Sequence, residues 1–203
     1  MKSIYSFLCC FIFIGTSYVC SAQSDNGSPY RTQPTLEEKV TKSDLVIEGL
    51  VESVTGFRAN KGNIYTSVII RITKLFKGTV SDSIIEVIVD GGTADSILVM
   101  VSHGLILSTG MEGIFLLSPN QTEVKYAKEV KSFIPLYGER SYIGYHPEIY
   151  MVAHHVATCK GVTYDDLEKD LFEPIEAVTK TPRKVMGLNM FERKAAITQK
   201  DNK

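Results

Sequence analysis

Histidine and cysteine side chains are the groups of this 203-residue chain best suited to acid–base or metal chemistry. His103 stands before Gly104 at the expected end of a strand, where an imidazole can act as a general base or a ligand. His154, His155 and Cys159 would place imidazole and thiolate groups on one helical face, as zinc ligands. They lack C-x-x-C or H-E-x-x-H spacing, and no nucleophile elbow accompanies His103. We therefore expect no catalytic residue, metal or cofactor; a metal-dependent or hydrolytic enzyme using these residues is the alternative.

Two adjacent glycines, Gly91 and Gly92, raise the question of a phosphate-binding loop. Such a loop leads directly into a helix, whose free N–H groups hold the anion. Here the glycines stand between two strand-like runs, and the chain contains no Gly-Lys-Ser or Gly-Lys-Thr sequence. Because paired glycines readily adopt positive φ, the sequence predicts a turn between two strands.

A cluster of tyrosines suggests a binding surface. Tyr137, Tyr142, Tyr145 and Tyr150 lie within fourteen residues, with Arg140 among them. Exposed aromatic rings stack on sugars or on a protein partner, because they offer a large contact area at low entropic cost. The alternative is that the same rings pack beneath the loop, against the sheet.

The N-terminal segment predicts export. A basic residue is followed by an apolar run over residues 7–14 and by small residues near Ala22, which is the order found in a signal peptide. We expect a signal peptide over residues 1–22, with cleavage between Ala22 and Gln23. Acylation of Cys20 is the alternative. The mature protein would then be secreted, periplasmic or held at the cell surface.

The rest of the chain has the length of one domain and contains a single cysteine, Cys159, which cannot form an internal disulfide. Residues 23–34 are polar and indicate a linker. No later run is apolar enough for a transmembrane segment. Residues 180–203 carry a net charge of +5 and residues 23–179 carry −7. The acidic body argues against nucleic-acid binding, and the basic end is expected to be a flexible, solvated tail.

Apolar periodicity places these residues on a mainly β domain over residues 35–179. The clearest strand is residues 64–75, whose alternation is that of a half-buried strand. We expect a small antiparallel OB-like barrel or sandwich with Val68 and Ile70 in its core, joined by Phe115 and Leu117. The expected strands cover residues 45–54, 64–75, 84–89, 97–101, 113–117, 133–136 and 141–145, with a weaker candidate at 123–130.

Two helices flank the expected strands. Thr35 and Glu38 have the spacing of a capping box, which predicts a short helix ending near Ser43. Thr163 can cap a second helix over residues 164–179, in which Pro174 would cause a kink or break.

The order of these segments resembles an OB-like β-barrel domain of secreted, Bacteroidetes-type envelope proteins. The landmarks lie within residues 43–118 and read S-D-L-V-I-E-G-L-V-E-S-V, N-I-Y-T-S-V-I-I-R-I-T-K-L-F-K-G, I-I-E-V-I-V-D-G-G and G-M-E-G-I-F-L-L. None of these motifs is catalytic. In some relatives the domain precedes a protease or a sorting module, and neither is visible here.

Two Asp-Ser-Ile sequences resemble the O-glycosylation site of the same group of bacteria. Ser83 and Ser96 are the candidate acceptors, each in a predicted turn just before a strand; ordinary Asp-Ser turn chemistry is the alternative. Together these observations predict an exported, non-enzymatic binding or accessory domain, whose partner is an envelope protein or a glycan of unknown identity.

Overall fold

The structure, a computed structural model, describes residues 33–60, 62–146 and 156–201. Its first element, α1 (Leu36–Lys42), begins with the predicted capping box. The Glu38 N–H donates to the Thr35 hydroxyl (3.1 Å), and the Thr35 N–H donates to the Glu38 carboxylate (2.9 Å). The helix ends at Ser43, as expected, because the chain there turns to extended backbone.

A large mixed sheet makes up most of the described chain, so the mainly β class is confirmed. The strands pair in the order β1-β2-β3-β7-β6-β8-β9-β10, β11 pairs with β2, and β6 also pairs with β1. β3 and β7 run parallel, which corrects the expectation of a purely antiparallel sheet; the long chain between them supplies the crossover that parallel neighbours need. The strands of this sheet are β1 (Leu45–Arg58), β2 (Ile64–Lys77), β3 (Ile84–Asp90), β6 (Glu112–Pro119), β7 (Ser132–Pro135), β8 (Tyr142–Tyr145), β9 (Ala157–Cys159), β10 (Val162–Tyr164) and β11 (Lys184–Val185).

The predicted core is confirmed. Val68, Ile70, Phe115 and Leu117 are all fully or almost fully buried and belong to one cluster on the inner face of the sheet. A second apolar cluster covers the opposite face, where Ile114 and its neighbours on β6 meet the helices. β6 is therefore buried on both faces, which explains its unbroken apolar sequence.

The Gly-Gly stretch forms a turn, as predicted. Gly91 and Gly92 have φ of 83° and 120°, and they lead from β3 into β4 (Gly92–Ala94). The predicted strand 97–101 is shorter, because β5 covers Ile97–Val99, and it pairs with β4 in a separate two-stranded sheet. The weaker candidate at 123–130 is a loop.

The second predicted helix starts later than expected. Thr163 lies in β10, and the chain enters a π-helical turn, η3 (Glu168–Phe172), followed by α2 (Glu173–Thr179). Asp166 caps this start, since its carboxylate accepts from the N–H groups of Glu168 (2.9 Å) and Lys169 (3.1 Å). Pro174 sits in the first turn of α2, where its missing N–H costs least.

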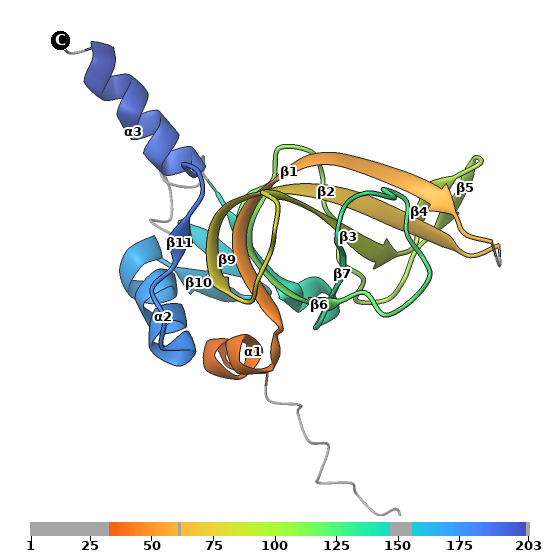
Figure 1. The fold of residues 1–203 in the computed structure, drawn as a ribbon, viewed down its shortest axis with the longest axis horizontal. Helices are drawn as coiled ribbons and strands as arrows, with labels where there is room; N and C mark the ends of the chain where they lie inside the picture. Colours follow the sequence, from red (N-terminus) through yellow and green to blue (C-terminus); the bar gives the residue numbers. More distant parts are fainter. Residues whose placement is uncertain (1–32, 61, 147–155, 202–203) are drawn as a thin grey trace, which may run out of the picture. The chain divides into compact units, whose positions relative to one another are not determined.

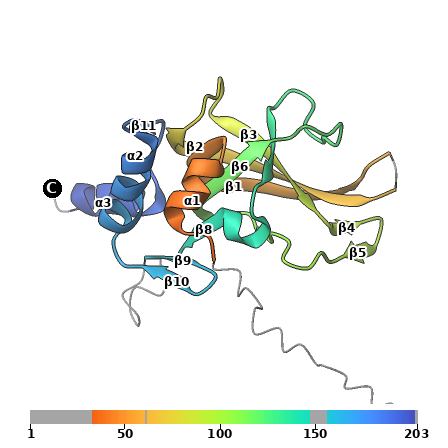
Figure 2. The ribbon, with the colours of Figure 1, turned by 90° about the horizontal axis from the view of Figure 1, so that it is seen from below.

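The basic C-terminal end is not a free tail. It forms β11 and a helix, α3 (Met190–Asp201), and Asn189 before this helix is only 2% exposed. Figures 1 and 2 show the three α-helices gathered near one end of the long strands β1 and β2, with the β4–β5 hairpin at the other. In the described part of the chain, no helix has the length and apolar character needed to cross a membrane.

Candidate functional site

Exposed apolar side chains run without a break along β5 and the two residues after it. Leu98 and Met100 are 64% and 78% exposed, and Ile106, a few residues on, is 77% exposed. We call residues 97–101 together with Ile106 the apolar segment. Single exposed apolar residues are common on protein surfaces, but a continuous run of them marks an interaction site.

The apolar segment covers a cavity of about 420 Å³. Val54, Val68 and Val89 line it from the strands, and Leu105 and Leu107 line it from the connecting chain. Both leucines are 7% exposed and pack into the inner core, so they anchor the connecting chain while the apolar segment stays at the surface.

Close backbone contacts hold the β4–β5 hairpin over β1 and β2. A side chain at Gly56 on β1 would collide with the carbonyl of Thr93, at 1.9 Å. A side chain at Gly92 would meet the hydroxyl of Thr66, at 2.0 Å, and the same hydroxyl donates to the Gly91 carbonyl (2.7 Å). The glycines therefore allow the hairpin to lie directly on the strands and to present the apolar segment outward.

The turn of this hairpin is a tight two-residue turn. Asp95 and Ser96 have φ of 51° and 63°, the sign pattern of the type I′ turn that suits twisted antiparallel strands. Arg58 on β1 pairs with Asp95 at 2.9 Å, and both side chains are largely exposed. The predicted glycan acceptors Ser83 and Ser96 are both exposed, and their modification stays a prediction.

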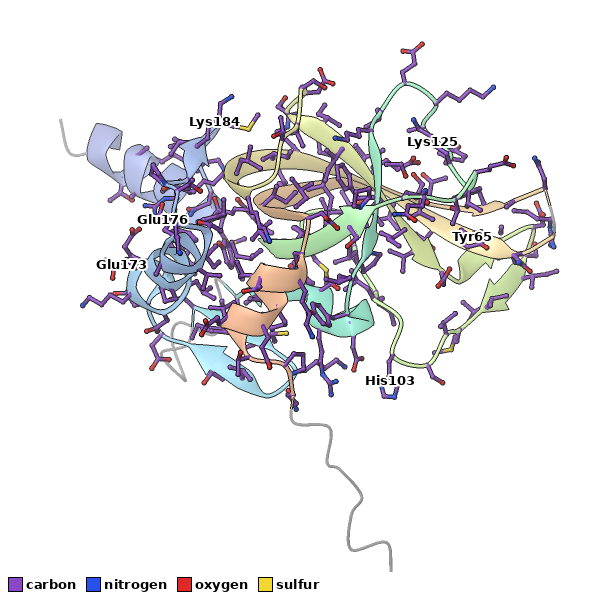
Figure 3. All side chains as sticks on the ribbon, turned by 60° about the horizontal axis from the view of Figure 1, so that its bottom comes forward. Tyr65, His103, Lys125, Glu173, Glu176 and Lys184 are labelled. Carbon is purple, nitrogen blue, oxygen red and sulfur yellow. The ribbon has the colours of Figure 1, made fainter. Side chains whose placement is uncertain are left out.

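His103 lies on the surface beside an ion pair. Its side chain is 84% exposed and points away from the sheet (Figure 3). Its Nδ1 lies 3.3 Å from the Glu139 carboxylate, which also contacts the Lys160 ammonium at 2.5 Å. The hydrogen bond from Lys160, and to a smaller extent the one from His103, hold the pKa of Glu139 below its ordinary value. In the described part of the chain, the imidazole thus contacts a carboxylate.

The other predicted ligands are not brought together in the described chain. Cys159 is buried, with its thiol 3.8 Å from the Lys39 ammonium and 3.7 Å from the Arg140 carbonyl. His154 and His155 lie outside the described residues. Within the part of the chain that the structure describes, no three His, Cys, Asp or Glu side chains form a group that could hold a metal ion.

The tyrosine cluster turns largely inward, so for Tyr142 and Tyr145 the structure matches the interpretation in which the rings pack against the sheet. Tyr145 is 5% exposed, and its hydroxyl donates to Glu48 (2.7 Å); burial raises its pKa well above the ordinary value. Tyr142 packs against Phe115, with ring centroids 4.9 Å apart, and burial raises its pKa too. These rings face the core because β8 sits inside the sheet. Tyr137 and Arg140 are half-buried beside β8, and Tyr150 lies outside the described residues.

A buried polar cluster was not predicted. The Glu48 carboxylate accepts from the ammonium of Lys74 (2.7 Å) and from the side-chain amide of Asn189 (2.9 Å). Lys74 also pairs with Glu192 at 2.9 Å, and the ion pair of Lys74 with Glu48 is almost fully buried. The available signal was a charged residue within an apolar strand run, namely Glu48 in β1 and Lys74 in β2. This cluster docks the C-terminal segment onto the sheet, so its role is structural.

A second buried acid extends this cluster. Glu112 accepts from Arg193 at 2.7 Å, and its side chain is fully buried. Burial raises the pKa of Glu112 above its ordinary value, although Arg193 opposes the shift. Burial also acts on Glu192, yet the backbone N–H of Asn189 and the ammonium of Lys74 together hold the pKa of Glu192 below its ordinary value.

Comparisons with known proteins assign no family to the chain. Neither the protein-family models nor the curated proteins contain a match to the chain.

Proposed function

We propose that the chain is an exported, non-enzymatic domain that binds a partner protein through the apolar segment. The observation that carries this proposal is the continuous exposure of residues 97–101 and Ile106 above an apolar cavity. Burying such side chains against a partner gains roughly 25 cal/mol per Å² of apolar surface removed from water. Leu105 and Leu107 also anchor the chain beneath the segment, so little conformational freedom has to be lost on binding.

A protein partner fits this surface better than a glycan. A sugar site needs several polar groups that hydrogen-bond to hydroxyls, combined with an exposed aromatic ring. The side chains of the apolar segment are aliphatic or thioether, and they carry no donor. A partner that contributes aliphatic side chains, or an extended backbone beside them, would complement the segment directly.

We further propose an OB-like interpretation of the fold. It is supported by the strand pairing β1-β2-β3-β7-β6 and by the additional pairing of β6, the fifth strand in this order, with β1, the first. An OB-fold is a partly open, five-stranded Greek-key barrel that binds ligands with a strand face and adjoining loops. In this interpretation the apolar segment belongs to the connection between the third and fourth strands.

Export is proposed from the signal-peptide pattern of residues 1–22, which lie outside the described residues. N-terminal sequencing of the exported form should begin at Gln23. A retained Met1 would refute this part of the proposal, and an acylated Cys20 would replace it with a lipoprotein.

The binding proposal is tested by capture with matched variants. Immobilised wild-type protein, Ile106→Asp and Ile197→Asp are exposed to envelope extract from the producing cells. Ile197 is also an exposed isoleucine, at 62%, but it lies on α3. We expect the wild type and Ile197→Asp to retain the same partner. The affinity of Ile106→Asp for that partner should fall at least about tenfold, since a buried unpaired carboxylate costs more than 1.4 kcal/mol. Equal capture by both variants would refute the proposal.

A further inference from the structure

β5 presents a free edge in the described chain. It pairs with β4 alone, and the register places Ala94 opposite Ile97 and Gly92 opposite Val99. In a hairpin with a two-residue turn, these opposite pairs exchange the hydrogen bonds of the ladder. The N–H and C=O groups of Leu98 therefore point away from β4, toward the free edge.

This edge lacks the protection that sheet edges normally have. Exposed edge strands usually carry a lysine, a proline or an inward-pointing charge, because unpaired backbone groups invite another strand. The five residues 97–101 read Ile-Leu-Val-Met-Val and include none of these. All five are exposed large apolar residues. An edge of this kind is suited to being covered by another strand.

The sequence around the edge is complementary to itself. Around Val99 at the centre of residues 97–101, Leu98 matches Met100 and Ile97 matches Val101. Two identical strands in antiparallel order would therefore place aliphatic or thioether side chains opposite one another. Asp95, Ser96 and His103 have positive φ and lie in the turns at the two ends of this stretch, outside the pairing.

We propose that a second copy of this chain pairs with β5, antiparallel, about a two-fold axis at Val99. Leu98 of one copy then lies opposite Met100 of the other, and the outward N–H and C=O groups of Leu98 bond to the second copy. The inference rests on the proposed function in one respect, that the apolar segment is a binding surface, and it names one occupant for the edge of that surface.

The resulting dimer should be reversible. About five residues a side cover less area than the roughly 1,600 Å² of a standard interface. We therefore expect the mass of the protein, measured by light scattering after size exclusion, to rise from monomer toward dimer as the loading concentration increases. A monomer mass at every concentration would overturn the inference.

Edge variants give the matched comparison. Leu98→Pro removes an N–H that points outward and takes no part in the β4–β5 ladder, so the variant should fold and remain a monomer. Met100→Lys should also remain a monomer, because lysine protects an edge. Ile197→Asp, on α3 and outside the apolar segment, should dimerise as the wild type does. Dimers of unchanged strength in Leu98→Pro and Met100→Lys, with unchanged melting curves, would refute pairing at this edge.

Cysteine crosslinking tests the register. In the proposed pairing the two Val99 residues form a pair without ladder hydrogen bonds, whose Cα atoms lie about 4.5 Å apart, close enough for a disulfide. Val99→Cys should therefore give a crosslinked dimer under mild oxidation. Leu98→Cys, which faces Met100 and carries the same native cysteines, should crosslink at least about tenfold more slowly. Equal rates would refute the register.

Failure of this inference can be told apart from failure of the proposed function. If the wild type is monomeric and Ile106→Asp fails to capture the partner, the dimer is overturned and the binding proposal stands. A dimer that captures partners equally well with Ile106→Asp supports the edge pairing and overturns the other proposal.

Discussion

Lys74→Met should be among the most destabilising single substitutions in the described chain. The Lys74 ammonium lies 2.7 Å from the Glu48 carboxylate, with side-chain exposures of 2% and 0%, and 2.9 Å from Glu192. Removing the cation leaves Glu48 as a buried charge without its counterion. Breaking a buried pair in this way costs about 3–5 kcal/mol. That is a large share of the roughly 5–15 kcal/mol by which domains of this size are stable.

The geometry also predicts how the loss is recovered. Glu48 accepts hydrogen bonds from Thr73 (2.8 Å) at one oxygen and from Tyr145 (2.7 Å) at the other. An uncharged glutamine can keep the bond from Tyr145 with its amide oxygen and donate its amide N–H to the Thr73 hydroxyl. Glu48→Gln combined with Lys74→Met should therefore be more stable than Lys74→Met alone by about 2 kcal/mol or more, because replacing both charges removes the uncompensated one.

Urea unfolding followed by circular dichroism at pH 7 measures these free energies. Asp95→Asn is the surface control, since the ion pair of Asp95 with Arg58 is 68% and 37% exposed and should be worth at most about 1 kcal/mol. A cost below about 1 kcal/mol for Lys74→Met, or a double variant with additive losses, would refute the reasoning. Either result would mean that water or another group compensates Glu48.

Three further outcomes follow from other sites. The raised pKa of Glu112 means that its contribution to stability is complete below the unfolded pKa and is lost as pH rises through the folded one. Glu112→Gln should therefore gain stability relative to the wild type as pH rises above the ordinary carboxyl pKa, as measured by urea unfolding, and a constant difference would contradict this. Gly92→Ala should lower stability by about 1–3 kcal/mol, because φ is 120° and Thr66 lies too close; an unchanged melting curve would disprove the close contact. Val68→Asp should abolish cooperative thermal unfolding, since it buries an unpaired carboxylate, and a wild-type transition would show that the strand register is wrong.

Much of the local structure could be predicted from neighbouring residues. The capping box at Thr35 and Glu38 connects residues three apart, and the alternation along β2 needs only the identity of each side chain. The turn at Gly91 and Gly92 follows from glycine's freedom to adopt positive φ. Thr163 as a helix cap was wrong because pairing with β9 held it in a strand.

The candidate site was harder to predict. The apolar run 97–101 was visible in the sequence, but its exposure depended on how the hairpin lies across β1 and β2. The same ambiguity applied in reverse to the tyrosines, since Tyr145 looked suitable for a surface and was placed in the core. Aromatic and aliphatic residues suit either environment, so composition alone cannot assign them.

Side-chain period and contacts within a few residues were enough to predict the mainly β class, the four named members of the inner core and the capping box of α1. Tertiary structure alone decided the parallel pairing of β3 with β7, the docking of the C-terminal end, and which apolar run stayed exposed. Asn189 and Glu48 lie 141 residues apart, and Lys74 and Glu192 lie 118 apart. The partners in such contacts are selected by the packing of the whole chain, because a buried charge is stable only where the fold happens to bring its counterion and hydrogen-bond donors.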